Sequence, residues 1–142
     1  MKLIDYIINR ALDTPKKLFC CIEGVTYDYC TFNQHVESIQ YSIRSLDLNE
    51  NRILLNFDKK INLLCGIIAC NREKKIPIIP PDKYDQIEII DYSSIVKSCS
   101  ELNEINCMIQ QKKEIYNKEY IYNSSDIQCV MFTSGSEGFP KP

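Results

Sequence analysis

The sequence contains no tryptophan, only one histidine and only four glycines, and it has no long apolar run. Its longest uninterrupted apolar stretch, residues 63–70, is far shorter than the roughly 20 residues that a membrane-spanning helix needs. Asp5 and Arg10 interrupt the N-terminal segment where a signal peptide would need an apolar core. We therefore expect no membrane span and a location in the cytoplasm.

Charge of one sign is also lacking. The 17 basic and 19 acidic residues leave a formal net charge of −2, so no overall field attracts nucleic acid or an anionic membrane. The length of 142 residues and the hydrophobic content of 44% are typical of one globular domain. A ligand or partner must therefore be recognised by a local site.

The scarcity of histidine argues against a zinc site and a histidine-based catalytic triad. His35 is the single histidine, and no Cys-x-x-Cys pair accompanies it. His35 lies on the polar side of a helical pattern, so we expect it to face solvent. The eight cysteines are expected to be reduced, because the chain lacks the loop-rich composition of disulfide scaffolds. Six lie in or beside apolar runs and are expected to pack as small hydrophobes: Cys20, Cys21, Cys65, Cys70, Cys107 and Cys129.

The first part of the chain predicts a helix, a hairpin and a second helix. Apolar residues recur at helical spacing over 2–13. Two strand-forming runs then flank Glu23-Gly24, where glycine can supply the positive φ of a tight turn. Thr31 and Gln34 have the spacing of a capping box, which predicts that a helix opens there. An apolar stripe over residues 32–46 predicts its buried face: Phe32, Val36, Ile39, Ile43 and Leu46.

The middle of the chain predicts a parallel crossover unit. Residues 52–57 and 76–79 are short apolar runs, and residues 60–71 between them have a helical pattern. Strand, helix and strand in this order are typical of two parallel strands joined by a crossover. Pro80 and Pro81 end the second strand, because proline offers no backbone donor.

The remaining residues carry weaker patterns. Residues 82–104 have a helical signal, 105–109 resemble a buried strand, and 110–126 are charged and favour a solvated connector. Residues 127–132 are apolar and predict a strand that leads directly into a loop. The expected fold class is therefore α/β: a mostly parallel sheet with crossover helices, plus an N-terminal helix and a β-hairpin.

Residues 133–141 are the one stretch that carries recognisable chemistry. Gly135 and Gly138 permit backbone angles that other residues resist, and neighbouring hydroxyl groups supply short donors. Lys141 adds a compact positive charge suited to phosphate. These features favour a phosphate-binding loop, although glycine, serine and proline also form ordinary surface turns. The loop is not of the G-x-x-x-x-G-K-[ST] type, because two residues separate Gly138 from the lysine and a proline follows it.

The string FTSGSEGFPK at residues 132–141 resembles the phosphate-binding loop of the adenylate-forming superfamily. That superfamily comprises acyl-CoA synthetases, adenylation domains of peptide synthetases, acyl-carrier-protein ligases and luciferases. The similarity continues upstream, so residues 1–142 resemble the N-terminal part of the AMP-binding domain, a partial subdomain that ends in the loop 133–141, with the C-terminal remainder absent. The chain departs from the family pattern at turns: Glu50-Asn51 replaces a Gly-Asp pair, Glu73-Lys74-Lys75 replaces an Ala-Gly pair, and Pro142 replaces a glycine.

The resemblance implies an activity and its ligands. Family members activate a carboxylate with ATP, release pyrophosphate and form an acyl-adenylate, and then pass the acyl group to CoA or a carrier protein. ATP and Mg²⁺ are thus the implied cofactors, and a carboxylic or amino acid is the implied substrate. The resemblance assigns the phosphate contacts to Thr133, Ser134, Gly135, Ser136, Glu137, Gly138 and Lys141. The family's catalytic and metal-binding residues lie downstream of this loop, so none is implied within this sequence.

Three interpretations stay open at this point. The first is an N-terminal fragment of an adenylate-forming ligase, arising from truncation, a disrupted reading frame or a split gene with a separately encoded C-terminal portion. The second is a non-catalytic interaction module that retains the fold. The third is a small nucleotide-binding protein outside this family. Under the first interpretation, we expect the chain alone neither to bind ATP tightly nor to form adenylate.

Overall fold

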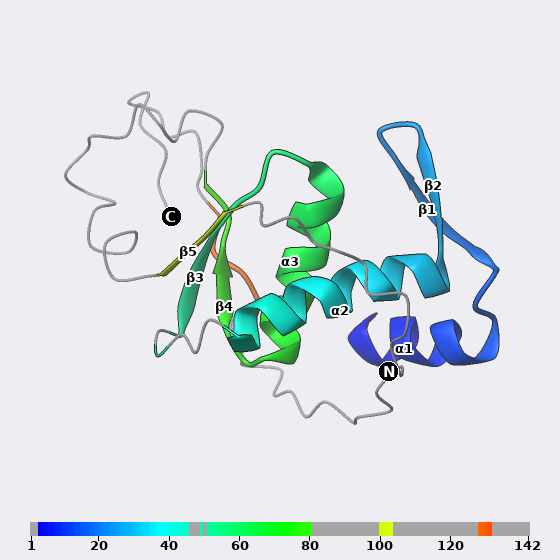
Figure 1. Ribbon diagram of the computed structural model, residues 1–142, viewed down its shortest axis with the longest axis horizontal. Coiled ribbons are helices and arrows are strands. Elements are labelled where there is room, and N and C mark those ends of the chain that lie inside the picture. Colours follow the sequence, from blue (N-terminus) through cyan, green and yellow to red (C-terminus); the bar gives the residue numbers. More distant parts are fainter. Residues whose placement is uncertain (1–2, 46–48, 50, 81–99, 104–127, 132–142) are drawn as a thin grey trace.

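Helices and strands alternate along the chain in the order expected of an α/β fold (Figure 1). The computed structural model describes residues 3–45, 49, 51–80, 100–103 and 128–131. The predicted N-terminal helix, hairpin and strand-helix-strand unit are confirmed. The elements are α1 (Leu3–Asp13), β1 (Leu18–Ile22), β2 (Val25–Asp28), α2 (Tyr29–Ser45), β3 (Arg52–Asn56), α3 (Lys60–Arg72), β4 (Ile76–Ile78) and β5 (Ser100–Asn103).

The β1–β2 hairpin turns through two residues with positive φ. Glu23 has a φ of 51° and Gly24 a φ of 78°, the combination that a two-residue turn needs to match the twist of its strands. Ile22 pairs with Val25 across this turn, and the strands run antiparallel. The role predicted for Gly24 is confirmed. Glu23 adopts the same left-handed region, at a cost of about 1–2 kcal/mol for a residue with a side chain.

The helix α2 begins at Tyr29, two residues before the predicted capping box. The Thr31 N–H donates to Asp28 Oδ1 over 2.7 Å, so Asp28 caps the helix and the capping role predicted for Thr31 is wrong. This hydrogen bond also holds the pKa of Asp28 below its ordinary value. The first two helical N–H groups donate to backbone carbonyls of the loop before β1, at 3.1 and 3.0 Å. Because that loop supplies acceptors, the helix starts earlier than the capping pattern indicates.

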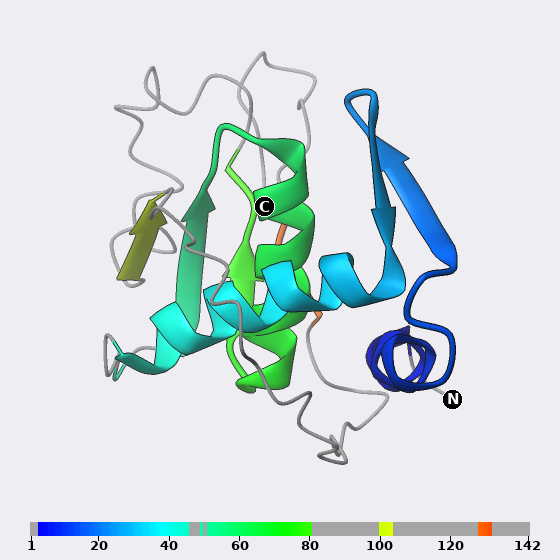
Figure 2. The same ribbon diagram turned by 45° about the vertical axis from the view of Figure 1, so that its right-hand side comes forward.

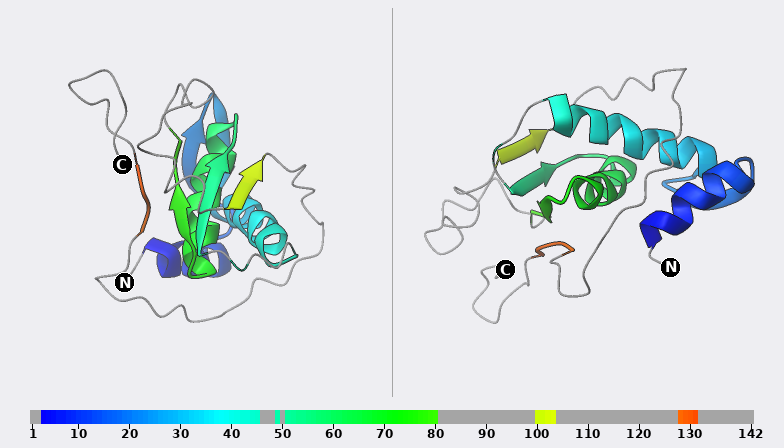
Figure 3. Two further views of the ribbon diagram at one scale, coloured as in Figure 1. Left: turned by 90° about the vertical axis from the view of Figure 1, so that its left-hand side faces the viewer. Right: turned by 90° about the horizontal axis from the view of Figure 1, so that it is seen from below.

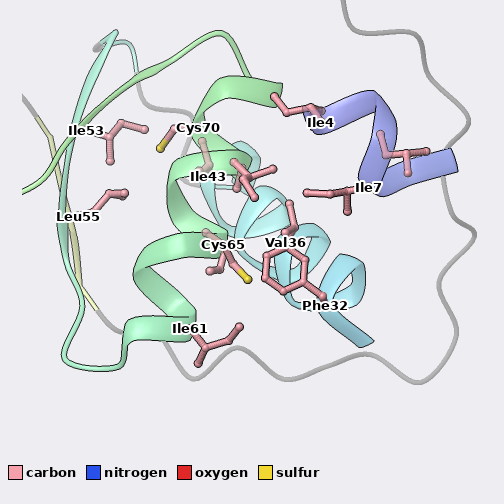
Figure 4. Close-up of a cluster of buried hydrophobic side chains, with 14 residues drawn as sticks. Ile4, Ile7, Phe32, Val36, Ile43, Ile53, Leu55, Ile61, Cys65 and Cys70 are labelled. Carbon is pink, nitrogen blue, oxygen red and sulfur yellow. The ribbon is translucent and has the colours of Figure 1, made fainter. Parts of the chain in front are cut away.

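The helix α3 lies between the sheet and α2 and is buried on both sides (Figure 4). Cys65 is completely buried between Leu55 of β3 and Val36 of α2, and both of these residues belong to the same apolar cluster. A helix that is apolar all round is the expected solution for such a position. The apolar stripe predicted for α2 is confirmed at Phe32, Val36, Ile39 and Ile43, and Leu46 lies outside the described residues.

The parallel sheet has the order β5-β3-β4, and Val130 extends it beyond β4 (Figure 3). Leu54 of β3 aligns with Ile78 of β4 on one side and with Glu101 of β5 on the other. Both pairings are parallel, which confirms the predicted crossover through α3. Figures 2 and 3 show the two-stranded hairpin standing apart from this sheet, beside the start of α2.

Two predictions downstream of β4 change. Residues 100–103 form β5, so the helix predicted to reach residue 104 is wrong there. Parallel pairing with β3 outweighs a weak helical pattern in this segment, because strand formation follows the available partner. The rest of 82–104, the strand predicted at 105–109 and the connector at 110–126 lie outside the described residues. Of the strand predicted at 127–132, residues 128–131 are described, and they pair with β4 through Val130.

His35 is half-buried, so the prediction that it faces solvent is wrong. The Tyr27 ring of β2 meets the imidazole edge to face, with ring centroids 5.6 Å apart. The helical pattern places His35 on the polar side of α2, but it carries no information about the hairpin that folds over that side.

The cysteines differ in burial along the chain. Cys65 and Cys70 are buried as small hydrophobes, as predicted, and burial raises the pKa of Cys70 to about 12. Cys21 is exposed on the hairpin, so the prediction that it packs in the core is wrong. Cys21 lies between half-buried Cys20 and Ile22, so alternation along this part of β1 points its side chain to the opposite face. The remaining free thiols among the described residues are half-buried: Cys20, Cys30 and Cys129.

The turn after α3 has the geometry of a helix end that usually contains glycine, although none is present here. The N–H of Lys75 donates to the Cys70 carbonyl over 2.8 Å, and the N–H of Lys74 donates to the Asn71 carbonyl over 3.1 Å. Lys74 has a φ of 55°, so these two bonds form a Schellman motif around a left-handed lysine. The Glu73-Lys74-Lys75 run therefore forms a regular helix end without a glycine.

A buried polar bridge joins the end of α3 to α2. The Asn33 side chain donates to Glu37 Oε1 over 3.0 Å and accepts from Arg72 Nη2 over 2.7 Å. The neighbouring Glu73 pairs with Arg44 of α2 at 2.6 Å. An amide can serve as donor and acceptor at once, so Asn33 satisfies a carboxylate and a guanidinium in an interior where unpaired charge is costly.

Replacing Arg72 by methionine tests this bridge. We expect Arg72→Met to lower the free energy of unfolding by about 1.5–3 kcal/mol, because the buried Asn33 amide oxygen loses its charged donor. Lys60→Met, at the exposed start of the same helix, is the matched control and should change stability by less than about 0.5 kcal/mol. Urea unfolding measures both variants. Equal effects of the two substitutions would contradict a stabilising role for the bridge.

Candidate phosphate-binding site

The carboxyl ends of the parallel strands meet at one edge of the sheet. The strands β3, β4 and β5 end at Asn56, Ile78 and Asn103, and Val130 runs parallel to β4 beside them. In open α/β sheets, ligands bind outside the carboxyl ends of the strands, where loops converge. This edge is therefore the expected position of a nucleotide site.

Two backbone hydrogen bonds hold residue 130 in register with β4. The Val130 N–H donates to the Pro77 carbonyl over 2.8 Å, and the Ile79 N–H donates to the Val130 carbonyl over 2.9 Å. The backbone N–H and C=O of Val130 thus both point toward β4. The backbone N–H and C=O groups of Cys129 and Met131 therefore point away from β4. The chain leaves this pairing at the carboxyl edge of the sheet, immediately before the predicted loop.

On the face of the sheet opposite α3, a row of apolar side chains supports the same strand pairing. Leu54 and Ile78 are almost completely buried, at 1% and 0% exposure, and they lie directly opposite each other in the register. Val130 continues the row and is half-buried. The next side chain, Met131, is 61% exposed, so burial along this segment ends at Val130.

Charged residues at this edge were not identified from the sequence. Asp58, Lys59 and Lys60 come after β3 and Phe57 and lead into α3, whose first residue is Lys60. Lys59 takes the N-cap position with no side-chain hydrogen bond to the helix N-terminus. The Asp-Lys-Lys run was visible in the sequence, but only the parallel sheet brings it to the edge that the predicted loop leaves.

The predicted site residues themselves lie outside the described residues. They are Thr133, Ser134, Gly135, Ser136, Glu137, Gly138 and Lys141. The structure therefore describes the chain up to Met131 and the sheet edge beside it, while the course of the loop and its phosphate contacts stay predictions.

The described part of the chain contains neither a cluster of metal-ligand residues nor a helix that could span a membrane. Within the described ranges, no three histidine, cysteine, aspartate or glutamate side chains gather closely enough to hold a metal ion. None of the helices described is both long and apolar enough to cross a bilayer.

Comparisons with known proteins reveal similarity in structure alone. No protein-family model and no curated protein matches the chain. The N-terminal subdomain of NpsA from Klebsiella oxytoca matches with a TM-score of 0.69 and 14% identity, over 97% of this chain and 40% of that chain. O-succinylbenzoate coenzyme A synthetase from Bacillus subtilis, in complex with AMP, matches with a TM-score of 0.67 and 11% identity, over 95% and 40%.

A third structure extends the set to another acyl-activating enzyme. The fatty acyl-adenylate ligase from L. pneumophila, in complex with acyl adenylate and pyrophosphate, matches with a TM-score of 0.60 and 19% identity, over 96% of this chain and 29% of that chain. The chain thus has the α/β fold of the N-terminal portion of adenylate-forming enzymes. It spans 40% or less of the length of these three solved chains.

A proline substitution tests the register at the loop entrance. Val130→Pro removes the donor to Pro77, and we expect the Ile79 amide to exchange about fivefold faster or more, for the roughly 1 kcal/mol of one net hydrogen bond. Met131→Pro is the matched control, because the Met131 N–H faces away from β4 and its loss spares the ladder. Hydrogen exchange followed by NMR reads the Ile79 amide directly. Unchanged Ile79 exchange in Val130→Pro would show that the pairing is absent in solution.

Proposed function

We propose that this chain is the N-terminal portion of an ATP-dependent, carboxylate-activating ligase of the adenylate-forming superfamily. In the intact enzyme, a carboxylic or amino acid would react with ATP to give an acyl-adenylate and pyrophosphate. The acyl group would then pass to the thiol of CoA or a carrier protein. The proposed site of action is the cytoplasm, where ATP and these thiols are available.

The observation that carries this proposal is the pairing of Val130 with β4 at the carboxyl edge of the sheet. Thr133 follows Val130 by three residues, so covalent geometry keeps their Cα atoms within about 11 Å. The loop 133–141 must therefore start close to the edge where α/β sheets bind nucleotides. The shared fold and the FTSGSEGFPK string support the same conclusion independently.

The proposed chemistry of the loop is electrostatic. Backbone N–H groups around Gly135 and Gly138, together with the hydroxyls of Thr133, Ser134 and Ser136, would donate to the β- and γ-phosphates of ATP. Lys141 would add a positive charge, and these groups would stabilise the negative charge that develops on the leaving pyrophosphate.

Two further features shape this electrostatic environment. Glu137 carries like charge, so its carboxylate must point away from the phosphates or be separated from them by Mg²⁺ or solvent. Magnesium, when bound, would neutralise phosphate charge. Within the described ranges the chain offers it no ligand cluster, so we assign it no protein ligand.

We further propose that the chain alone is inactive. The solved chains that share its fold are at least about twice as long, since it spans 40% or less of them. By resemblance, the groups that hold adenine, ribose and the carboxylate come from downstream parts of such enzymes. Ordering the loop also costs about 1–2 kcal/mol of entropy for each residue, which offsets much of the gain from phosphate contacts.

The phosphate site can be tested on the chain as it is. Titration with pyrophosphate, followed by NMR, should shift the amide signals of residues 133–141 at millimolar ligand. Lys141→Ala should weaken this binding about tenfold or more, because a charged contact contributes about 1.5–3 kcal/mol. Lys17→Ala removes the same charge at an exposed position before β1 and is the control. Shifts that avoid residues 133–141, or equal weakening in both variants, would exclude the site.

Catalysis is tested separately by exchange of labelled pyrophosphate into ATP. We expect none from the chain alone with any carboxylate, because adenylate formation needs groups beyond the phosphate loop. Heat-denatured chain sets the background. Carboxylate-dependent exchange by the purified chain would overturn the proposed inactivity and would show that these residues suffice.

A further inference from the structure

The hairpin and α2 meet through an aromatic contact that includes the only histidine. Tyr27 of β2 lies against His35 of α2, with ring centroids 5.6 Å apart and an angle of 83° between the planes. Tyr27 is also one of the half-buried side chains that pack against the central apolar cluster. The imidazole therefore sits at the seam along which the hairpin touches the rest of the fold.

The buried nitrogen of this imidazole has no partner. His35 Nδ1 is inaccessible to solvent and forms no hydrogen bond with any described residue. Burial lowers the pKa of His35, and no described charge contributes to that shift. A proton on this ring would place a positive charge and an unsatisfied N–H in an apolar seam, which proteins avoid by neutralising the group or by opening.

Three other titratable groups at the seam, Tyr27, Cys20 and Asp28, do not change charge in the range where histidine does. Tyr27 and Cys20 have pKa values raised by burial, so they are neutral at and below neutral pH. Cys65 of α3 and Glu23 of the turn act on Tyr27 but do not contribute to the shift at His35. At the base of the hairpin, Asp28 has a lowered pKa and stays ionised as its cap on α2 requires.

We propose that the hairpin is a pH-responsive element: protonation of His35 releases Tyr27 and the outer part of the hairpin from α2. The base of the hairpin stays attached, because Phe19 meets Phe32 edge to face, with ring centroids 4.7 Å apart, and Asp28 still caps α2. A two-stranded hairpin has little stability of its own, so the loss of one docking contact suffices to free its outer part.

The direction of the pH dependence follows from the neutral docked state. Docking is strongest above the ordinary histidine pKa of about 6.5, and it weakens as pH falls through that value toward the lower pKa of the docked form. The population of the released hairpin rises tenfold for each unit that separates the two pKa values.

The test follows His35 and the hairpin together by NMR. The imidazole signals should titrate below pH 6.5, and the amides of β1 and β2, corrected for intrinsic exchange, should lose protection over the same range while those of α3 keep it. His35→Phe keeps an aromatic ring without a titrating group, and its hairpin protection should not depend on pH. Tyr27→Leu should return the His35 pKa toward 6.5 with α3 protection unchanged.

Three outcomes would overturn the proposal. The first is a His35 pKa at or above 6.5 in the wild-type chain, and the second is a pH-dependent hairpin in His35→Phe. The third is simultaneous loss of protection in the hairpin and α3, because it would mean that acid unfolds the whole fold rather than its hairpin. None of these outcomes bears on phosphate binding, so the two proposals fail independently.

Discussion

The burial of α3 on both sides is the constraint on which the rest of the structure depends. This helix must be apolar toward the sheet and toward α2 at the same time, so it has almost no polar face. It also lies close to β3: a Cβ at Gly66 would come within 2.8 Å of Phe57 Cε2 and 3.2 Å of Leu55 Cδ1. The absence of a side chain at Gly66 therefore sets how closely the helix and the strand approach.

Because α3 is buried on both sides, its charged residues lie at its two ends. At its end, Arg72 is buried and must be satisfied by Asn33 of α2, which fixes how the two helices meet. At its start, Lys59 and Lys60 lie at the carboxyl edge of the sheet, on the side from which the chain leaves Val130. One buried helix thus accounts for the parallel return of β4 and for the charge next to the proposed phosphate site.

Local patterns in the sequence predicted most of the described fold, because α1 and α2 are amphipathic and the strands of the crossover unit are short and apolar. The stripe from Phe32 to Ile43 and the crossover through α3 needed no tertiary information. The start of α2 could not be predicted from local patterns, because backbone carbonyls of a preceding loop accept hydrogen bonds from its first N–H groups. The position of His35 and the strand β5 also depend on partners distant in the sequence, which periodicity does not contain.

The candidate site likewise has one part that residue types predict and one part that depends on strand pairing. The glycines, hydroxyls and lysine of residues 133–141 are recognisable from residue type alone, because phosphate chemistry demands those types. The edge that receives them is not recognisable in this way, because it is created by the pairing of Val130 with β4 and by the parallel course of three strands. Only that arrangement brings Asp58 and its two neighbouring lysines to the edge beside the proposed site.

The left-handed lysine after α3 shows that a helix end of the glycine type does not require a glycine. Lys74 keeps a backbone conformation that glycine adopts more easily, at a cost of about 1–2 kcal/mol that the rest of the turn must absorb. Two main-chain hydrogen bonds preserve the geometry, so the side chain is free to change. Residues at such turns can therefore differ between chains whose backbone geometry is the same. A chain can then share its architecture with enzymes to which it is only 11–19% identical.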